Sequence, residues 1–466
     1  MKISFHGAAQ TVTGSKHLIT LNNGKQLLLD CGMFQGMGQQ TDTLNRSFGF
    51  NPAEVNYLVL SHAHIDHSGL IPKLVRNGFA GKIFCTPATR DLSAILLEDS
   101  AIIQRADTKY INRKRIKKHL PLFEPMYDVQ DAKQSLSLFE VKPYNTWFKI
   151  DDEIEVLFTD AGHIIGSAVV SLKIIENNKT TAIAFSGDIG RYNGAILKSP
   201  ETFPQADYII CESTYGNKLH DEVHETTDTL LQWIEKTCLA KKGNLVIPAF
   251  SVGRTQELLI VLNKLENENR LPKINYYVDS PLSIEATQVV RSHPENFNNK
   301  LRDVLLKDQD VFNFYGLHYV ESVEESKAIN LYEHPCVIIS ASGMADAGRI
   351  RHHIRNNISD AKNTILLVGY ASPSSLGGKL ADGLKKVNIY GDEFEVIAEV
   401  GEMKSMSAHG DYDDLIMFLS CQDKSLVKKL FIVHGEYDVQ LDFAHRLTRK
   451  GWNVEVPGMN SAFELS

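Results

Sequence analysis

The chain has 466 residues, which exceeds one typical domain and fits two or three. Hydrophobic residues make up 43% of it, no apolar run is long enough to span a bilayer, and the net charge of −8 argues against non-specific coating of nucleic acid. The start carries no signal-peptide pattern, and the six cysteines are scattered without a CxxC pair, which suggests reduced thiols. We therefore expect a cytoplasmic protein without a membrane segment.

The N-terminal part is rich in predicted strands. Short apolar runs at 3–5, 17–21 and 26–30 predict three of them, and Asn22-Asn23-Gly24 predicts a turn between the second and third. Asp30 ends the third strand, so its carboxylate can reach a neighbouring loop. The apolar run 57–60 predicts a further short, buried strand.

A histidine cluster follows that strand directly, in the sequence His62-Ala63-His64-Ile65-Asp66-His67. Imidazole and carboxylate together suit zinc or another borderline divalent ion rather than a thiolate or all-oxygen site. His62 and His64 can share one ion on a tight loop, and Asp66 and His67 would then address a second ion. A merely solvated polar loop would need three uncommon histidines to share this spacing by chance.

The next segment contains a predicted helix and a basic run. Thr86 and Pro87 predict the N-cap and the first residue of a helix running toward Gln104. Six lysines and arginines then fall within ten residues: Lys109, Arg113, Lys114, Arg115, Lys117 and Lys118. This run predicts either a solvated helix face or a patch that contacts phosphates, and the sequence does not separate the two.

The order of predicted elements indicates two kinds of domain. Strands are predicted at 155–158, 168–175, 182–185 and 208–210. From about Glu212 strands and helices alternate, which predicts a parallel sheet covered by helices, and after about Val387 strands return. We therefore expect residues 1–209 and 389–466 to form a metal-binding domain, and residues 210–388 to form an inserted α/β domain.

Three more residues of metal-ligand type follow predicted strands. They are His163, Asp188 and His434. Singly, each is more typical of ordinary loop chemistry, but with the histidine cluster they form a coherent set. In this set one zinc is held by His62, His64 and His163, the second is held by Asp66, His67 and His434, and Asp188 bridges the two. A water position between the ions is what a catalytic site requires.

This order of motifs resembles the metallo-β-lactamase fold. More narrowly, the chain resembles the β-CASP branch of nucleases, whose motifs are matched by Glu212 in Cys211-Glu212-Ser213-Thr214-Tyr215-Gly216, His409 in Ser407-Ala408-His409 and His434 in Val433-His434-Gly435-Glu436. Further similarity runs through residues 247–258 and 341–344. The resemblance covers essentially the whole chain. It implies the α/β class, with an αββα sandwich and an inserted β-CASP domain built on a parallel sheet flanked by helices.

The resemblance also implies a function. It points to a zinc-dependent ribonuclease with two Zn²⁺ per chain that leaves 5′-phosphate and 3′-hydroxyl ends, cleaving as an endonuclease, a 5′-to-3′ exonuclease or both. RNA-cleaving members of the branch carry histidine at the position of His434, whereas DNA-repair members carry an apolar residue. We therefore expect single-stranded RNA as the partner. A homodimer is a further expectation that the sequence does not decide.

Four residues have expected catalytic roles. Asp66 would orient the attacking water as well as bind metal. His409 suits a general acid because the intrinsic pKa of histidine lies near working pH, and Glu212 would hold its tautomer. Asp30 is better interpreted as an orienting partner of the histidine loop than as a ligand. The alternative for His409 is an ordinary surface histidine.

Two other classes of function remain. A small-molecule thioesterase or lactonase of the same fold would share the zinc ligands but would not need the inserted domain, Glu212 or His409. A redox di-iron protein fits less well, since such members carry glutamate where this chain has His64. A non-catalytic subunit of an RNA-processing complex would have lost ligands, whereas here the set is complete.

Overall fold

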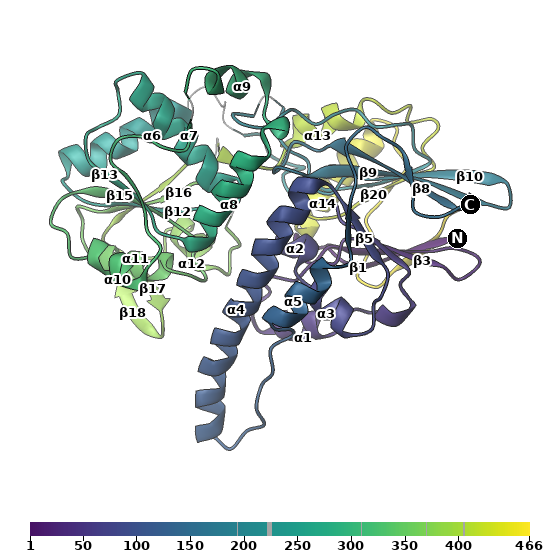
Figure 1. Cartoon of the computed structure of the whole chain (residues 1–466), viewed down its shortest axis with the longest axis horizontal. Helices are drawn as coiled ribbons and strands as arrows, with labels where there is room; N and C mark the ends of the chain where they lie inside the picture. The colour runs from purple at the N-terminus through teal and green to yellow at the C-terminus, as the bar shows by residue number, and fades with distance from the viewer. Residues whose placement is uncertain (193, 221–225, 309, 370, 404–405) are drawn as a thin grey trace. The chain divides into compact units, whose positions relative to one another are not determined.

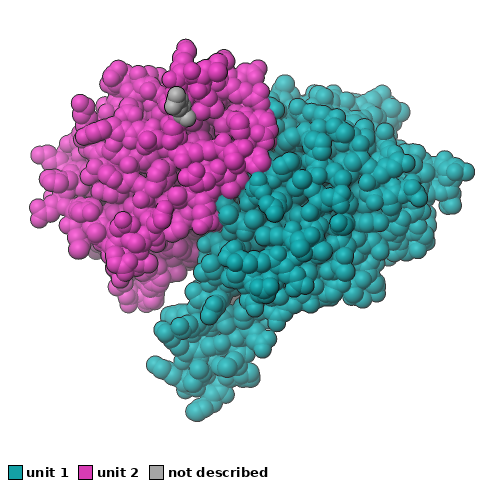
Figure 2. Space-filling view, in the orientation of Figure 1, with its two compact units in different colours: residues 1–193, 198–219, 409–466 teal, residues 194–197, 220–408 magenta. Residues whose placement is uncertain are grey.

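The computed structural model describes residues 1–466 except 193, 221–225, 309, 370 and 404–405 (Figure 1). The chain forms two compact units, which are coloured separately in Figure 2. Unit 1 comprises residues 1–193, 198–219 and 409–466, and unit 2 comprises residues 194–197 and 220–408. Within the described ranges, no helix combines the length and the apolar character that crossing a membrane demands.

Unit 1 is built on two seven-stranded sheets. The first sheet has the strand order β22 (Ala462–Glu464), β1 (Lys2–Gly7), β2 (Lys16–Thr20), β3 (Gln26–Leu29), β4 (Tyr57–Val59), β5 (Lys82–Cys85) and β6 (Phe139–Val141). The second has the order β21 (Val454–Glu455), β20 (Lys429–Ile432), β11 (Tyr208–Cys211), β10 (Lys179–Phe185), β9 (Ala168–Glu176), β8 (Ile154–Asp160) and β7 (Phe148–Lys149). Strands β10, β11 and β20 are parallel neighbours, so the residues that follow them emerge at one edge.

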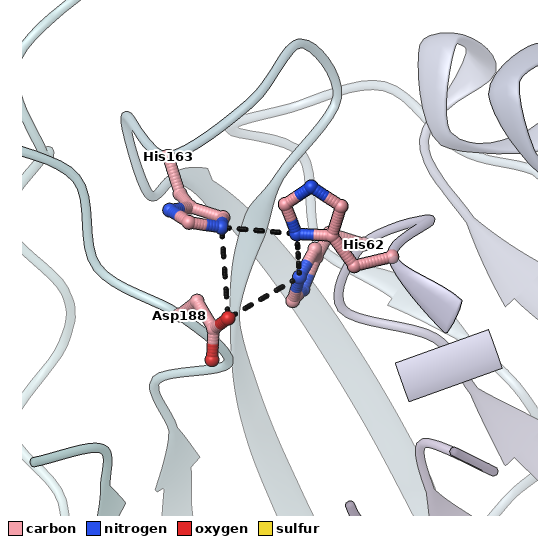
Figure 3. A group of neighbouring side chains, drawn as sticks. His62, His163 and Asp188 are labelled. Atoms are coloured by element: carbon pink, nitrogen blue, oxygen red, sulfur yellow. Dashed lines mark hydrogen bonds and ion pairs between the residues drawn. The ribbon is translucent and has the colours of Figure 1, made fainter. Parts of the chain in front are cut away.

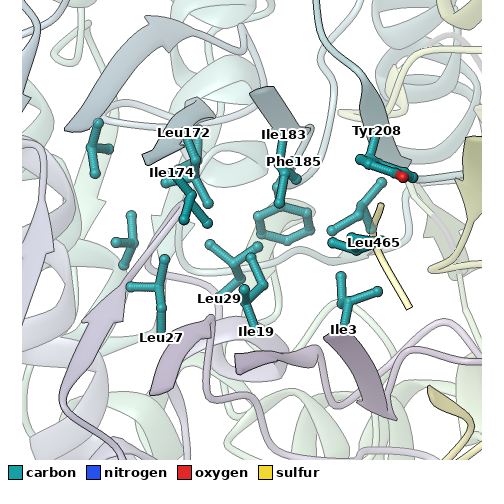
Figure 4. Packing of buried hydrophobic residues seen from close by; sticks show 14 of the residues in the cluster. Ile3, Ile19, Leu27, Leu29, Leu172, Ile174, Ile183, Phe185, Tyr208 and Leu465 are labelled. Carbon is teal, nitrogen blue, oxygen red and sulfur yellow. The ribbon is translucent and has the colours of Figure 1, made fainter. Parts of the chain in front are cut away.

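The two sheets pack face to face around one hydrophobic core (Figure 4). Strand β9 shows how alternation places its residues: Val170 and Leu172 lie in this core, whereas Val169 lies in a separate cluster on the opposite face of the sheet. The same core contains Leu29 of the first sheet and Phe185 of the second. Burial of both inner faces therefore holds the two sheets together.

Helices cover the outer face of each sheet. Leu97 and Ala132, from two helices, pack with Leu58 of the first sheet, and Phe443 packs with Ile209 of the second. The predicted αββα sandwich is therefore confirmed. The helices of unit 1 are α1 (Thr41–Arg46), α2 (Ile65–Ser68), α3 (Ile71–Arg76), α4 (Pro87–Lys117), α5 (Val129–Leu136), α13 (Tyr412–Leu419) and α14 (Tyr437–Arg449), with short 3₁₀ helices at Gly38–Gln40 and Pro52–Glu54.

Helix α4 is longer than the sequence predicted. Thr86 caps it through its side-chain oxygen and Pro87 is its first residue, as expected, but the helix continues past Gln104 to Lys117 and has 31 residues. The predicted end was wrong because the second half has no apolar stripe, and Ala101 is its last buried residue. The basic run therefore lies on a helix, outside the core.

Unit 2 contains a six-stranded sheet in which all neighbouring strands are parallel. Its strand order is β14 (Leu317–Tyr319), β13 (Asn275–Val278), β15 (Cys336–Ser340), β12 (Leu245–Pro248), β16 (Thr364–Leu367) and β19 (Glu399–Glu402), and a separate hairpin joins β17 (Lys386–Ile389) to β18 (Asp392–Glu395). The helices are α6 (Thr226–Ile234), α7 (Arg254–Asn267), α8 (Pro281–Ser292), α9 (Asn299–Leu305), α10 (Val323–Ile329), α11 (Ile350–Asn357) and α12 (Leu376–Ala381), with a π-helix at Glu235–Ala240 and a 3₁₀ helix at Pro294–Asn296.

The inserted unit extends further along the chain than the expected range 210–388. Strand β19 pairs with β16 and forms an edge of the unit 2 sheet, so the residues up to 408 belong to this unit. At the other end, residues 210–219 belong to unit 1, because β11 continues to Cys211 beside β20. A short strand near a domain boundary does not reveal in its own sequence which sheet it joins.

The two faces of β9 provide a direct test of the core between the sheets. Leu172 is 1% exposed in that core, whereas Ile175 of the same strand is 37% exposed. We expect Leu172→Ala to lower the free energy of unfolding by about 2–5 kcal/mol, because it removes buried methyl groups and leaves a cavity. Ile175→Ala is the matched control and should change it by less than about 1 kcal/mol. An equal decrease in the free energy of unfolding for the two variants, measured by urea denaturation, would contradict this packing.

Candidate metal centre

The histidine loop leaves the sheet edge at the end of β4. This strand lies parallel to β3 and β5 in the first sheet, and α2 begins at Ile65. His62 and His64 therefore precede the helix, while Asp66 and His67 lie in its first turn. The change from extended backbone to helix within a few residues points the side chains of one short segment in different directions.

The chain after β3 holds this loop in place. The Cys31 amide donates to the His67 carbonyl at 2.7 Å, and the Met33 amide donates to the Ile65 carbonyl at 2.9 Å. Gly32 lies between them, where a Cβ atom would be only 1.6 Å from the carbonyl oxygen of Asp66. Only glycine permits this approach, so Gly32 contributes to the position of the histidine loop.

Four side chains form group 1, which is defined as His62, His64, His163 and Asp188 (Figure 3). Each offers one ligand atom, and these atoms lie within 4.8 Å of one another. His64 Nδ1 lies 3.2 Å from His62 Nε2 and 3.1 Å from His163 Nε2. Asp188 Oδ2 faces the same two imidazoles, at 3.4 Å from His62 Nε2 and 3.5 Å from His163 Nε2.

Three further side chains form group 2, which is defined as Asp66, His67 and His434. His434 Nε2 lies 3.1 Å from His67 Nε2 and 3.5 Å from Asp66 Oδ2. The second oxygen of Asp188, Oδ1, faces this group, at 3.2 Å from His67 Nε2 and 3.6 Å from His434 Nδ1. One carboxylate thus turns one oxygen to each group.

The chemistry of these residues fits a divalent metal. Burial lowers the pKa of His62 well below its usual value and that of His64 to about 4, so these imidazoles are neutral and present lone pairs. Asp188 Oδ1 is buried and finds no hydrogen-bond donor among the residues that the structure describes. A buried carboxylate oxygen without a donor is costly, and a facing cation would satisfy it. The structure therefore contains a metal-binding site.

Asp30 lies behind His67, outside both groups. Its Oδ2 is 2.6 Å from His67 Nδ1 and accepts from the Ser61 hydroxyl at 2.8 Å, while Oδ1 accepts from the Ser61 amide at 2.7 Å. Burial opposes a charged His67, but the carboxylates of Asp188 and Asp30 raise its pKa well above the usual value. The negative charge that favours a proton there also favours a bound cation.

His409 and Glu212 form a pair at the edge of group 1. His409 Nδ1 lies 3.1 Å from Glu212 Oε1, and its ring centroid is 4.5 Å from that of His163. Glu212 is held by the amides of Ile189 and Thr214, which donate to its two oxygens at 2.7 and 3.1 Å. Burial opposes a charged His409, but the Glu212 carboxylate raises its pKa to about 9.

Three supporting contacts were not predicted from the sequence. The Thr214 hydroxyl lies 3.1 Å from His434 Nδ1, and the Thr86 and Thr89 hydroxyls donate to the Gly166 carbonyl at 2.6 and 2.8 Å in the loop that carries His163. Thr214 stands two residues after Glu212 in the same motif, and this position was the only indication in the sequence that Thr214 contacts the site. The N-terminus of α4 offered only a capping pattern.

Two residues of the site have backbone angles that non-glycine residues rarely adopt. Asp30 has a φ of 58° and His434 a φ of 50°. Such conformations persist only where the surrounding contacts over-determine them, and they cluster at functional sites. The amide of His434, for example, donates to the Ala8 carbonyl at 2.7 Å, which fixes the turn after β20.

Comparison with known proteins identifies three family matches along the chain. Residues 14–236 match the metallo-beta-lactamase superfamily, residues 255–380 match the Beta-Casp domain, and residues 393–457 match the Zn-dependent metallo-hydrolase RNA specificity domain. Ribonuclease TTHA0252 of Thermus thermophilus is 33% identical over 98% of each chain. An RNase J-like protein of Methanocaldococcus jannaschii is 28% identical over 95% of this chain and 94% of its own. Transcription termination factor FttA of Methanosarcina mazei is 28% identical over 97% of this chain and 69% of its own.

Asp160 allows a test of the loop that carries His163. It ends β8, its Oδ1 accepts from the Gly162 amide at 2.9 Å, and burial raises its pKa to about 7. The folded state therefore binds this proton more tightly than the unfolded state, whose pKa is near 3.8. This contribution to stability is complete below that value and is lost as the pH rises through 7.

We expect Asp160→Asn, which keeps the accepting oxygen but carries no charge, to be more stable than the natural protein at pH 8. Urea denaturation between pH 4 and pH 8 measures this effect. The free energy of unfolding should rise by about 1–4 kcal/mol at pH 8, and the difference should disappear toward pH 4. Asp152→Asn, at an exposed position, is the control and should show no such trend. A gain or loss for Asp160→Asn that is constant with pH would contradict a raised pKa.

Proposed function

Since this chain belongs to the β-CASP family of metallo-β-lactamase-fold nucleases and is a metal-dependent hydrolase, we propose that it is a zinc-dependent ribonuclease acting in RNA processing or decay. It hydrolyses phosphodiester bonds of single-stranded RNA and leaves 5′-phosphate and 3′-hydroxyl ends. The observation that carries the proposal is Asp188, whose two oxygens face two groups of imidazoles. Six unpaired cysteines support action in a reducing cytoplasm.

RNA as the substrate has two supports. One is the relative from Thermus thermophilus, whose name is that of a ribonuclease and which aligns along the whole chain. The other is the RNA specificity domain matched by residues 393–457, which include His409 and His434. Both residues belong to unit 1 and contact the candidate metal centre, so the part of the chain related to RNA specificity reaches the site of chemistry.

Two zinc ions are the expected cofactors. His62, His64 and His163 would hold one, Asp66, His67 and His434 would hold the other, and Asp188 would bridge them. When bound, two such ions lower the pKa of a water and offset negative charge on a phosphate. Asp30 keeps His67 in the tautomer with Nε2 turned toward Asp188, because its carboxylate accepts from Nδ1.

The remaining chemistry falls to protein side chains. Asp66 orients the attacking water, which gives up one proton to solvent as its oxygen bonds to phosphorus and the bond from phosphorus to the 3′ oxygen breaks. That oxygen needs a proton, and His409 donates it. Glu212 acts as a positioning residue, since its carboxylate contacts Nδ1 of the His409 ring and so assigns the transferred proton to Nε2. The position of His409 beside the His163 ring supports this assignment.

The first experiment compares RNA with a small substrate. We expect the zinc-loaded protein to cleave a labelled single-stranded RNA, and the fragments to carry 5′-phosphates that a ligase requiring this end can join. His434→Ala removes an expected ligand and should reduce cleavage more than about 100-fold, with less bound zinc by elemental analysis. Hydrolysis of a thioester without cleavage of RNA would contradict the proposal, and cleavage of circular RNA would identify an endonuclease.

A second experiment separates the expected acid from the expected ligands. We expect His409→Ala to lower kcat by about 10²- to 10⁴-fold, because the departing 3′ oxygen loses its proton donor, while the zinc content stays at the natural level. His445→Ala, at an exposed histidine of α14, is the matched control and should leave both quantities unchanged. Loss of zinc from His409→Ala would make this residue a ligand rather than an acid.

A further inference from the structure

The second half of α4 forms an arm outside the core of unit 1. We define the arm as residues 102–126, which comprise the end of α4 and the segment that returns beside it. Ala101 is the last buried residue of the helix, and Figures 1 and 2 show the arm as a projection from unit 1 at the lower edge of the view. Burial against the core of unit 1 therefore does not explain why the helix continues to Lys117.

The return segment covers only one face of this helix. The Asn112 side chain exchanges two hydrogen bonds with the backbone of Phe123, at 2.8 and 2.9 Å, and Arg115 Nε donates to the Pro121 carbonyl at 2.6 Å. At the base of the arm, the Arg46 guanidinium lies 4.4 Å from the centre of the Phe123 ring and donates to the Glu124 carbonyl at 3.1 Å. The arm is thus an ordered element whose opposite face is exposed.

That opposite face carries a row of cations. Lys109, Arg113 and Lys117 follow one another at every fourth residue, and Lys114 lies beside them with its ammonium 4.4 Å from the centre of the Tyr110 ring. All four cations are exposed, and they form no ion pair with any residue that the structure describes. Residues 108–123 contain no aspartate or glutamate, in a chain whose net charge is −8.

The needs of the helix itself do not explain this row. Like charges four residues apart destabilise a helix, and the row places two such pairs along one face. The helix dipole favours cations only in the last turn, which accounts for Lys114 and Lys117 but not for Lys109. A polyanion lying along the face would remove the repulsion, and RNA is the polyanion that the proposed function supplies.

We propose that this basic face binds the phosphates of the RNA strand at a distance from the cleavage site, an inference that rests on the proposed ribonuclease function. Tyr110, which is 55% exposed between the cations, offers a ring on which a base can stack. The start of α4 is fixed to the loop of His163 through Thr86 and Thr89, so one helix links that loop to the basic face.

The length of α4 sets the length of RNA that can contact the candidate metal centre and the basic face at the same time. At about 1.5 Å per residue, Lys109 and Lys117 lie roughly 35 and 45 Å along the helix from Thr86. A strand stacked at about 3.4 Å per nucleotide needs on the order of ten nucleotides to span that distance. Longer RNAs therefore gain affinity from the arm, whereas shorter RNAs meet only the catalytic site.

The test uses the variant with Lys109, Arg113, Lys114 and Lys117 all changed to Gln. Binding of the zinc-loaded protein to an unstructured RNA of about 30 nucleotides is measured over a range of salt concentrations, with His409→Ala present in every variant of this binding assay so that cleavage is slow. We expect affinity at about 0.1 M salt to fall roughly tenfold or more, and the salt slope of log K to shrink by about 0.7 for each phosphate that the variant no longer neutralises. Cleavage of an RNA of about six nucleotides should match the natural protein, since it does not span the distance.

The matched control changes Lys2, Lys82, Lys149 and Lys179 to Gln, which removes the same charge from exposed positions of unit 1. It should keep the natural affinity and salt slope. An arm variant that binds the long RNA as the natural protein does would overturn the inference while the ribonuclease function stood. A natural protein that binds the long RNA through the arm but cleaves no RNA would support the inference and refute the function.

Exposed apolar side chains on the arm, among them Ile102, Ile116 and Leu122, make a protein partner the competing occupant. Sedimentation of both variants at matched concentration measures this outcome. A change of oligomeric mass in the arm variant with an unchanged RNA affinity would assign the arm to a contact between copies of the chain and would overturn RNA as its occupant. Thermal melting should show little change in stability, because relief of the repulsion between the cations offsets the lost interaction of Lys114 and Lys117 with the helix dipole.

Discussion

The whole site depends on the buried carboxylate of Asp188. One of its oxygens faces His62 and His163, and the other faces His67 and His434. A carboxylate buried with an oxygen that lacks a donor is stable only where positive charge compensates it. A bound divalent metal would supply that positive charge, and this requirement explains why several imidazoles surround a single acid.

The two sheets explain how residues far apart in sequence reach this acid. Strands β10, β11 and β20 are parallel neighbours, and they are followed by Asp188, Glu212 and His434, respectively. In the first sheet, parallel β3 and β4 are followed by Asp30 and the histidine loop. Parallel strands end at a common edge, so each sheet delivers its polar residues to one place. The apolar faces between the sheets supply the rigidity that holds these edges together.

The sequence allowed much of this site to be predicted because its residues are uncommon or follow recognisable strands. Histidines clustered from His62 to His67 have few explanations other than metal binding, and Asp188 and His434 each come shortly after an apolar run. Thr214 and Asp160 were not assigned roles, since threonine and aspartate are ordinary loop residues. The left-handed backbone at Asp30 and His434 left no signal either, because only glycine marks such positions reliably.

The parts of the fold that escaped prediction share a cause. Apolar periodicity reveals elements that pack on a core, and the second half of α4 has no such packing, so its end at Lys117 was missed. The edge strand β19 was expected in the C-terminal part of the metal-binding domain, yet it pairs with β16 of unit 2. Pairing partners are a property of the folded chain, and a four-residue strand carries too little pattern to specify one.

The most direct test of this account is anomalous scattering at the zinc absorption edge from crystals of the zinc-loaded protein. The account predicts two peaks per chain, one bounded by His62, His64 and His163 and the other bounded by Asp66, His67 and His434, with one oxygen of Asp188 directed at each. A single peak, or a pair of peaks that Asp188 does not separate, would contradict it.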